Sequence, residues 1–190
     1  MKYFKISSIL AAIALVCALV LAAMDMLTSP IIAKNNKETE KNTIVSIFKD
    51  YNEEKSVSVD VPEDNAYILA IVLAKDSSGN ELGYVYTVSG KNAYGTIKLM
   101  VAIKDNEVIQ VEFLENGQSF ASTVDKHVHA NYPSSEKKSI DVGFTSENQT
   151  FEGTLDESDV ANIDVACGAT YGAKLVKELV NAALEVAERR

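Results

Sequence analysis

Cysteine, histidine and tryptophan are scarce in this chain of 190 residues, which has two cysteines, two histidines and no tryptophan. Cys17 lies inside a long apolar run and Cys167 lies near the C-terminus, so we do not expect them to form a disulfide. His127 and His129 have no third or fourth ligand nearby in the sequence, and we expect them to be solvated polar residues. The residues therefore indicate no metal site and no Ser-His-Asp or Cys-His hydrolytic centre.

Positive charge is also in short supply. The chain has 18 Lys and Arg residues against 27 Asp and Glu residues, for a formal net charge of −9. Nucleic-acid binding is improbable for such a chain, because phosphate backbones select basic surfaces. The sequence has no glycine-rich dinucleotide fingerprint either, so we do not expect it to bind NAD directly.

A long apolar run stands near the N-terminus, from Ile6 to Met24. Its length is close to the roughly 20 residues that a helix needs to cross a bilayer. A cleaved signal peptide is the alternative, with Lys2 and Lys5 as its basic start. The run exceeds the usual apolar region of about 7–15 residues in signal peptides, which favours a retained transmembrane anchor over residues 6–27.

The orientation of this anchor is not decided by its flanking charges. Two lysines precede the run and three follow it within residues 28–41, so the count gives no preference. The segment begins like a signal sequence, and long domains are translocated largely regardless of their charge. We therefore place residues 1–5 in the cytoplasm and the C-terminal domain outside it, in a single-pass protein of the cell membrane.

The chain beyond the anchor is predicted to form one α+β domain. Residues 28–55 are expected to hold a linker and an amphipathic helix, because Ile44, Ile47, Phe48 and Tyr51 recur at helical spacing. The domain proper is assigned to residues 56–190. Apolar patterns and turn signals predict a mainly antiparallel sheet, with strands over residues 57–61, 66–74, 82–88, 96–103 and 107–114.

Two more helices are expected to flank this sheet. Residues 119–130 suit a short helix with Phe120, Val124 and Val128 turned inward. The last helix is predicted to start just after Thr170, since apolar residues recur at helical spacing from Leu175 onward.

The segment Asp164-Val165-Ala166-Cys167-Gly168-Ala169-Thr170 precedes that last helix. A helix start presents free backbone N–H groups and the positive end of the helix dipole, which together make an anion site. Gly168 lets the backbone approach a ligand closely. The arrangement therefore suits a phosphate held at, or bonded to, the Thr170 hydroxyl.

At these residues the chain resembles the flavinylation motif of the FMN-binding domain family. That family includes the G subunit of the Rnf ion-translocating ferredoxin:NAD oxidoreductase and the C subunit of the sodium-pumping quinone reductase. The resemblance implies that a flavin transferase, consuming FAD, joins FMN through its phosphate to Thr170. It also implies that Asp164, Gly168 and Ala169 belong to the motif that the transferase reads, with Cys167 where the family usually has Ser or Thr.

Two further segments bear on the resemblance. The stretch beginning Asn92-Ala93-Tyr94-Gly95 is similar to a family segment that precedes a hairpin, which implies that Tyr94 and Gly95 lie beside the flavin. An ordinary loop entering a strand is an equal alternative for this pair. Two stretches depart from the family: Tyr171-Gly172 replaces a small or β-branched residue followed by Thr or Ser, and residues 115–120 replace a Thr-Pro-Gly loop.

The function implied by the resemblance is electron relay and not catalysis by the chain alone. A membrane-anchored subunit carrying covalent FMN would pass electrons among the other membrane subunits of an Rnf-type complex, a redox-driven ion translocase. One alternative is a freestanding flavinylated protein for extracellular electron transfer. Another is an anchored interaction domain without redox activity, whose motif is decayed; Cys167, Tyr171 and the missing Thr-Pro-Gly loop are the features that favour it.

Overall fold

The computed structural model describes residues 2–134, 151 and 153–190 of the chain. The chain divides into two compact units, Met1–Lys41 and Asn42–Arg190. The first unit consists of most of helix α1, and the second is the α+β domain. Each is described by itself.

Helix α1 runs without interruption from Lys2 to Ile47. A separate amphipathic helix after the anchor is therefore the wrong expectation, and the helix passes through Pro30. Proline leaves one carbonyl of the preceding turn without its usual N–H donor. Hydroxyl groups near this point make local hydrogen bonds, with Thr28 Oγ1 donating to Met24 O at 2.8 Å and Ser29 Oγ donating to Asp25 Oδ1 at 3.2 Å.

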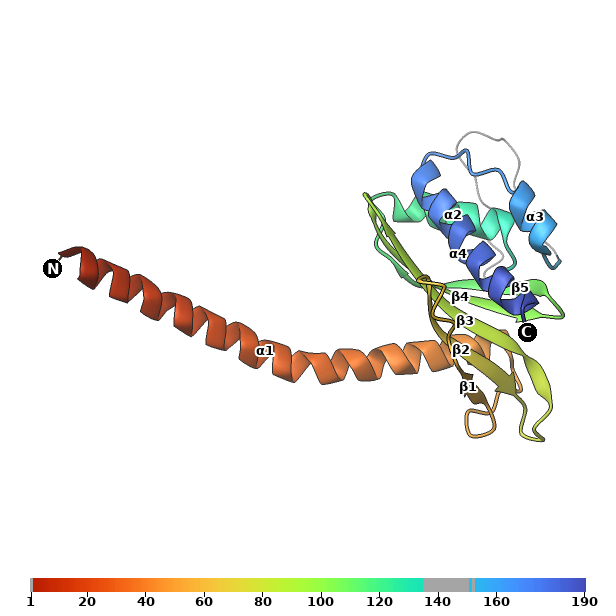
Figure 1. The fold of residues 1–190 in the computed structure, drawn as a ribbon, viewed down its shortest axis with the longest axis horizontal. Coiled ribbons are helices and arrows are strands. Elements are labelled where there is room, and N and C mark those ends of the chain that lie inside the picture. Colours follow the sequence, from red (N-terminus) through yellow and green to blue (C-terminus); the bar gives the residue numbers. More distant parts are fainter. Residues whose placement is uncertain (1, 135–150, 152) are drawn as a thin grey trace. The chain divides into compact units, whose positions relative to one another are not determined.

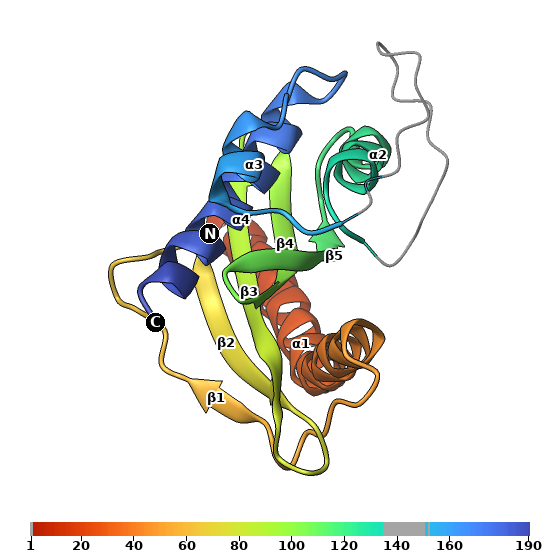
Figure 2. The same ribbon diagram turned by 90° about the vertical axis from the view of Figure 1, so that its right-hand side faces the viewer.

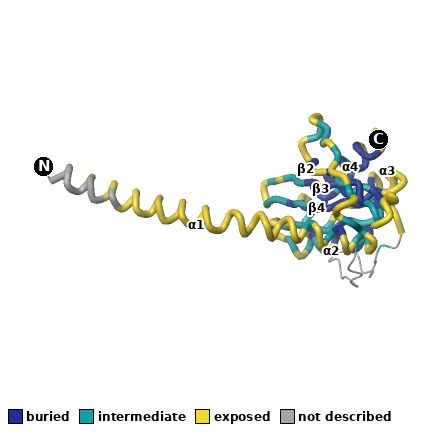
Figure 3. The backbone as a smooth tube through the Cα atoms, turned by 90° about the horizontal axis from the view of Figure 1, so that it is seen from below, coloured by how far each residue is buried: buried dark blue, intermediate teal, exposed yellow. Residues whose placement is uncertain are grey.

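The described part of α1 in the first unit is exposed almost throughout, as Figure 3 shows, and between Leu10 and Ile32 its exposed residues are largely apolar. By length and composition it is the one helix in the described chain that could cross a membrane. A helix that is apolar on every side is stable in hydrocarbon and not in water. This finding indicates single-pass membrane anchoring.

The second unit is built on a five-stranded antiparallel sheet in the order β1-β2-β3-β4-β5 (Figure 2). Every strand pairs with its neighbours in sequence, as the succession of apolar runs and turn signals predicts. Asp105 and Asn106 take positive φ angles of 53° and 63° in the tight turn between β4 and β5. The strands are β1 (Val57–Val59), β2 (Ile68–Lys75), β3 (Glu81–Asn92), β4 (Gly95–Lys104) and β5 (Glu107–Asn116).

Three helices cover one face of the sheet: α2 (Ala121–Asn131), α3 (Glu157–Asn162) and α4 (Thr170–Glu188) (Figure 1). The amphipathic helix α4 provides most of their apolar contact. Its residues Leu179, Val180 and Leu184 are fully buried against strand residues such as Leu99 and Val101. The observed architecture is thus the α+β class that the sequence predicts.

The opposite face of the sheet is covered in part by the end of α1 that belongs to the second unit. Ile44 is 5% exposed and packs in a cluster with Ala74, Val85 and Met100, against which Phe48 also packs. The side chains on both faces of β4 are therefore buried: Leu99 and Val101 on one face, and Met100 and Ala102 on the other. This confirms that the apolar stripe at Ile44 and Phe48 packs on the core.

Two expectations for α2 are wrong. His127 and His129 are buried, with 2% and 8% of their surface exposed, because the last turn of α2 is enclosed around most of its circumference, with residues 127–130 all buried. Phe120 precedes the helix and is 60% exposed, whereas Val124 is fully buried as expected. Polar contacts accompany this burial: Asn131 Nδ2 lies 3.3 Å from His127 Nδ1, and His129 Nδ1 lies 2.6 Å from Ser134 Oγ.

We expect Ile44→Ala to lower the free energy of unfolding of the α+β domain by about 2–5 kcal/mol, because it leaves a cavity beside Met100. Urea unfolding of the full chain in detergent micelles measures the change. Val45→Ala is the matched control, since Val45 is 40% exposed on the same turn and its loss should cost about 0.5 kcal/mol or less. Equal effects of the two changes would contradict packing of this helix end on the sheet.

We also expect the domain to lose stability below neutral pH through His127. Burial lowers the pKa of His127 below its ordinary value of 6.5, and the Asp164 carboxylate opposes part of that effect. The unfolded chain then binds more protons, so this contribution is complete above about pH 6.5 and declines as the pH falls toward the folded-state pKa. Urea unfolding at pH 7.5 and 5.0 measures the decline, which His127→Gln should reduce more than His129→Gln does. An undiminished decline in His127→Gln would show that other groups cause it.

Candidate functional site

Thr170 is the first residue of α4, one position earlier than the sequence predicts. Ala169 precedes the helix and accepts hydrogen bonds from Gly172 N and Ala173 N at 2.9 and 3.1 Å. The Thr170 hydroxyl donates to Cys167 O at 2.8 Å. The Thr170 side chain is half-buried, and it lies in a first helical turn, whose leading N–H groups have no preceding turn to accept their hydrogen bonds.

The loop before Thr170 is shaped by its own side chains. Asp164 Oδ1 accepts from Ala166 N at 2.8 Å, and Cys167 Sγ accepts from Ala169 N at 3.4 Å. Both contacts span two residues, as in the turns that Asp and Ser side chains make. Asp164 and Cys167 therefore set the path of the backbone toward Thr170.

A lysine fixes the loop to α4. Lys177 Nζ donates to Ala161 O at 2.7 Å and to Ile163 O at 2.9 Å, at the end of α3. These carbonyls come at or just after the last turn of that helix, where helix carbonyls have no N–H partner of their own. Lys177 therefore binds the start of the loop to α4, the helix that begins where the loop ends.

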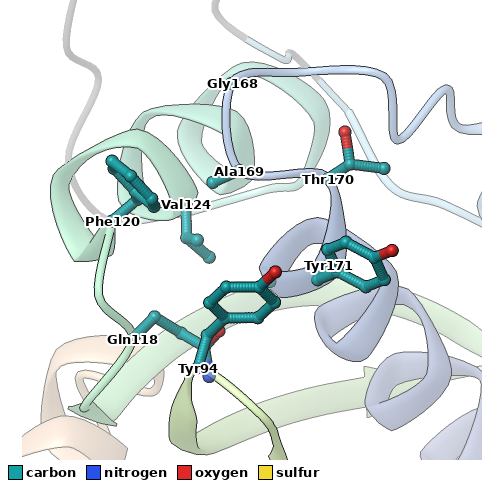
Figure 4. A pocket seen from close by; sticks show the side chains of 9 residues that line it. Tyr94, Gln118, Phe120, Val124, Gly168, Ala169, Thr170 and Tyr171 are labelled. Atoms are coloured by element: carbon teal, nitrogen blue, oxygen red, sulfur yellow. The ribbon is translucent and has the colours of Figure 1, made fainter.

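Tyr94 lies in the turn between β3 and β4, and Gly95 is the first residue of β4. The Tyr94 side chain lies beside the start of α4 (Figure 4). Asn92 joins the two elements: its Oδ1 accepts from Tyr94 N at 2.8 Å, and its Nδ2 donates to Tyr171 O at 3.1 Å. Gly95 has a φ angle of 142°, and a Cβ atom there would lie 2.0 Å from Gly117 O. Only glycine fits at this position.

The segment that replaces the family's Thr-Pro-Gly loop packs on this same turn. Gln118 Nε2 donates to Gly95 O at 2.7 Å, and Ser119 N donates to Tyr94 O at 3.0 Å. Gln118 is 7% exposed, so its amide is a buried polar group satisfied by the turn. Sequence reasoning missed Gln118, since its partner lies 23 positions away and no local pattern indicates it.

A cavity of about 270 Å³ lies where these three segments meet (Figure 4). Of the predicted site residues, Tyr94, Gly168, Ala169 and Thr170 line it, whereas Asp164, Cys167 and Gly95 do not. The rings of Tyr94 and Tyr171 stack, with centroids 5.3 Å apart and planes at 29°. The remaining lining residues are Gln118, Phe120, Val124, Tyr171 and Gly172.

Gly172 accounts for the close approach of α2 and α4 beside the cavity. A Cβ atom at Gly172 would lie 2.4 Å from Val124 Cγ2. The Val124 side chain therefore fills the space that a larger residue at position 172 would need. Gly172 stands where the family usually has Thr or Ser, and the buried Val124 of α2 occupies the space that such a side chain would take.

Comparison with known protein families gives two matches on this chain. The family described as the RnfG N-terminal region matches residues 3–47, which are almost the whole of α1. The family described as the FMN-binding domain matches residues 93–185. The second match contains every residue that lines the cavity, from Tyr94 to Gly172.

No curated protein matches this chain significantly. The two family matches follow one another in chain order, with the apolar helix in the first and the cavity in the second. The first match lies mainly in the first unit of the structure, and the second lies within the second unit. The chain is an RnfG-like FMN-binding protein.

Proposed function

We propose that this protein is a membrane-anchored electron-transfer subunit of an Rnf-type complex and carries FMN as a phosphoester on Thr170. The position of the Thr170 hydroxyl carries the proposal. It lies at the first residue of a helix, on the wall of an aromatic-lined cavity, within the residues that match the FMN-binding domain. The chain alone catalyses no reaction in this proposal.

The residues around Thr170 fit a flavin phosphate and its ring. The first turn of α4 offers backbone N–H groups and the positive end of its dipole to a phosphate. Gly168 leaves the approach open, because a Cβ atom there would meet only Thr123 Cγ2, at 3.6 Å. The apolar and aromatic side chains beyond Thr170 suit a planar heteroaromatic ring.

Attachment requires one phosphoryl transfer. The Thr170 Oγ1 atom attacks the FMN-side phosphorus of FAD, the bond from that phosphorus to the bridging oxygen breaks, AMP leaves, and the hydroxyl proton is released. The hydrogen bond from Thr170 Oγ1 to Cys167 O is lost in the product, since an ester oxygen has no proton to donate. A separate flavin transferase supplies the catalytic groups, and Thr170 serves afterwards as a tether.

Bound FMN supplies transfer of one or two electrons. The protein's part is to hold the ring and limit its contact with water. Val124 and Gly172 close the cavity between α2 and α4, and Gln118 secures the turn that carries Tyr94. Covalent attachment keeps the cofactor on a domain that faces away from the cytoplasmic pool of FMN.

The anchor sets the cellular context in this proposal. Helix α1 crosses the cell membrane once, with the N-terminus in the cytoplasm and the α+β domain on the other side. The match to the RnfG N-terminal region lies in this helix, which supports contact with the other membrane subunits of the complex. Electrons would arrive from one of these subunits and leave to another, coupled to ion translocation by the complex as a whole.

We expect covalent flavin on the wild-type chain when it is made together with a flavin transferase, and none on Thr170→Ala. In-gel flavin fluorescence after denaturation, with intact mass for the added FMN phosphoester, measures both. Thr170→Ser should keep some modification because it retains a hydroxyl. Thr123→Ala is the control, since this threonine lies close to Gly168 but outside the motif.

The outcomes separate the proposal from its alternatives. Fluorescence that persists in Thr170→Ala would place the flavin elsewhere. Wild-type protein without flavin would favour an anchored interaction domain. Flavin on Thr170 in cells that lack the other Rnf-type subunits would favour a freestanding electron carrier.

We expect Asp164→Asn to retain more flavinylation than Asp164→Ala. The asparagine side-chain oxygen can still accept from Ala166 N and preserve the loop, whereas alanine removes the acceptor. The fraction of modified chain, from intact mass, measures the difference. Equal loss in both variants would instead show that the transferase requires the carboxylate charge itself.

A further inference from the structure

Exposed aromatic side chains gather at the cavity beside Thr170. Among the residues whose side chains the structure describes, four aromatic residues are exposed: Tyr67, Tyr94, Phe120 and Tyr171. Three of these four line this one cavity. Phe120 and Tyr171 are 60% and 63% exposed, which is unfavourable for large apolar surfaces in water. Such a grouping marks a binding site for an apolar or aromatic partner.

These side chains come from three separate elements. Tyr94 lies in the β3–β4 turn, Phe120 precedes α2, and Tyr171 belongs to the first turn of α4. Figure 4 shows Phe120 on one side of the cavity and the two tyrosines on the other, with Val124 between them. The cavity thus has aromatic walls on two sides and an aliphatic floor.

The tyrosine wall is held in place by polar contacts. Asn92 binds the backbone of both tyrosines, and the two rings stack on each other. Ser119 N donates to Tyr94 O, which ties the segment that carries Phe120 to the same turn. Backbone contacts therefore set the positions of the walls.

We propose that Phe120 and Tyr171, together with Tyr94, hold the isoalloxazine ring of the flavin, with the tyrosine pair on one side of the ring and Phe120 on the other. This inference rests on the proposed function, because the ring is brought to the cavity by its attachment to Thr170. Tyr171 follows Thr170 directly in the sequence, so the tether and the wall belong to the same helical turn.

The tyrosine wall also has an electronic consequence. The oxidised isoalloxazine ring is planar and electron-poor, and a phenol ring is electron-rich, so stacking favours the oxidised form over the reduced form. The midpoint potential of the flavin is therefore lower with Tyr171 in place than without it. Phe120, which lacks the hydroxyl, contributes burial with a smaller effect on the potential.

The test uses the full-length flavinylated chain in detergent. Flavin emission of the native protein is compared with that of the same sample after proteolysis, since tyrosine in contact with an isoalloxazine ring quenches its fluorescence. Wild-type emission should be strongly quenched. Tyr171→Ala should raise it by roughly two- to tenfold, the change in ring docking expected from loss of an aromatic contact. Its midpoint potential, from a spectroelectrochemical titration, should also rise.

Two further variants keep the test decisive. Phe120→Ala lies outside the attachment motif and should increase quenching of the flavin by iodide, because it opens the other wall. Tyr67→Ala removes an exposed aromatic side chain away from the cavity and should leave the flavin emission, the midpoint potential and the iodide quenching unchanged. Measurements are made on the flavinylated fraction of each variant, so a lower yield of attachment does not obscure the result.

The inference and the proposed function fail in different ways. Flavin on Thr170 with emission and potential unaffected by Tyr171→Ala, and with iodide quenching unaffected by Phe120→Ala, would overturn the ring site and leave the electron carrier intact. Wild-type chain that takes up no flavin would overturn both.

Discussion

The packing of α4 across the sheet is the constraint on which the site depends. This helix buries one apolar face against β3 and β4, and its N-terminal half comes closest at Gly90. A Cβ atom at Gly90 would lie 2.8 Å from Leu175 Cδ1 and 3.2 Å from Leu179 Cδ2. The missing side chain in β3 therefore lets the helix approach the strand closely. Since Thr170 is the first residue of the same helix, this close packing also fixes the position of its hydroxyl.

A second set of contacts places the β3–β4 turn, with Tyr94, beside the start of α4. The β3–β4 turn reaches α4 through Asn92, and Gln118 holds the turn from the other side. The backbone conformation at Gly95 would be strained for any other residue. Gly95 packs against Gly117, which brings the chain after β5 next to the turn. Segments at positions 92–95, 117–124 and 168–172 thus meet at one point, although no two of them are neighbours in sequence. The cavity is a product of sheet topology as much as of the motif.

Sequence patterns predicted the parts of this arrangement that depend on local spacing. Thr170 and the small residues before it stand directly ahead of an amphipathic helix, and alternation along 96–103 marks a strand buried on both faces. What depends on distant partners could not be read in the same way. The amide of Gln118 has meaning only beside Gly95, and His127 looks like a surface residue until the side of α2 that carries it is known. Pro30 lies in the predicted linker, but α1 continues through it.

The departures from the family pattern are mutually adjusted in this structure, which argues against a decayed site. Cys167 makes the backbone contact that a serine or threonine oxygen would make, since its sulfur accepts from Ala169 N. Gly172 has no side chain, and Val124 occupies the space beside it. Tyr171 adds a ring that stacks on Tyr94 at the edge of the cavity. A site losing its function would accumulate unmatched changes, such as a filled cavity or an unsupported loop. Here Cys167, Tyr171 and Gly172 each have a matching neighbour, and the cavity beside Thr170 is present.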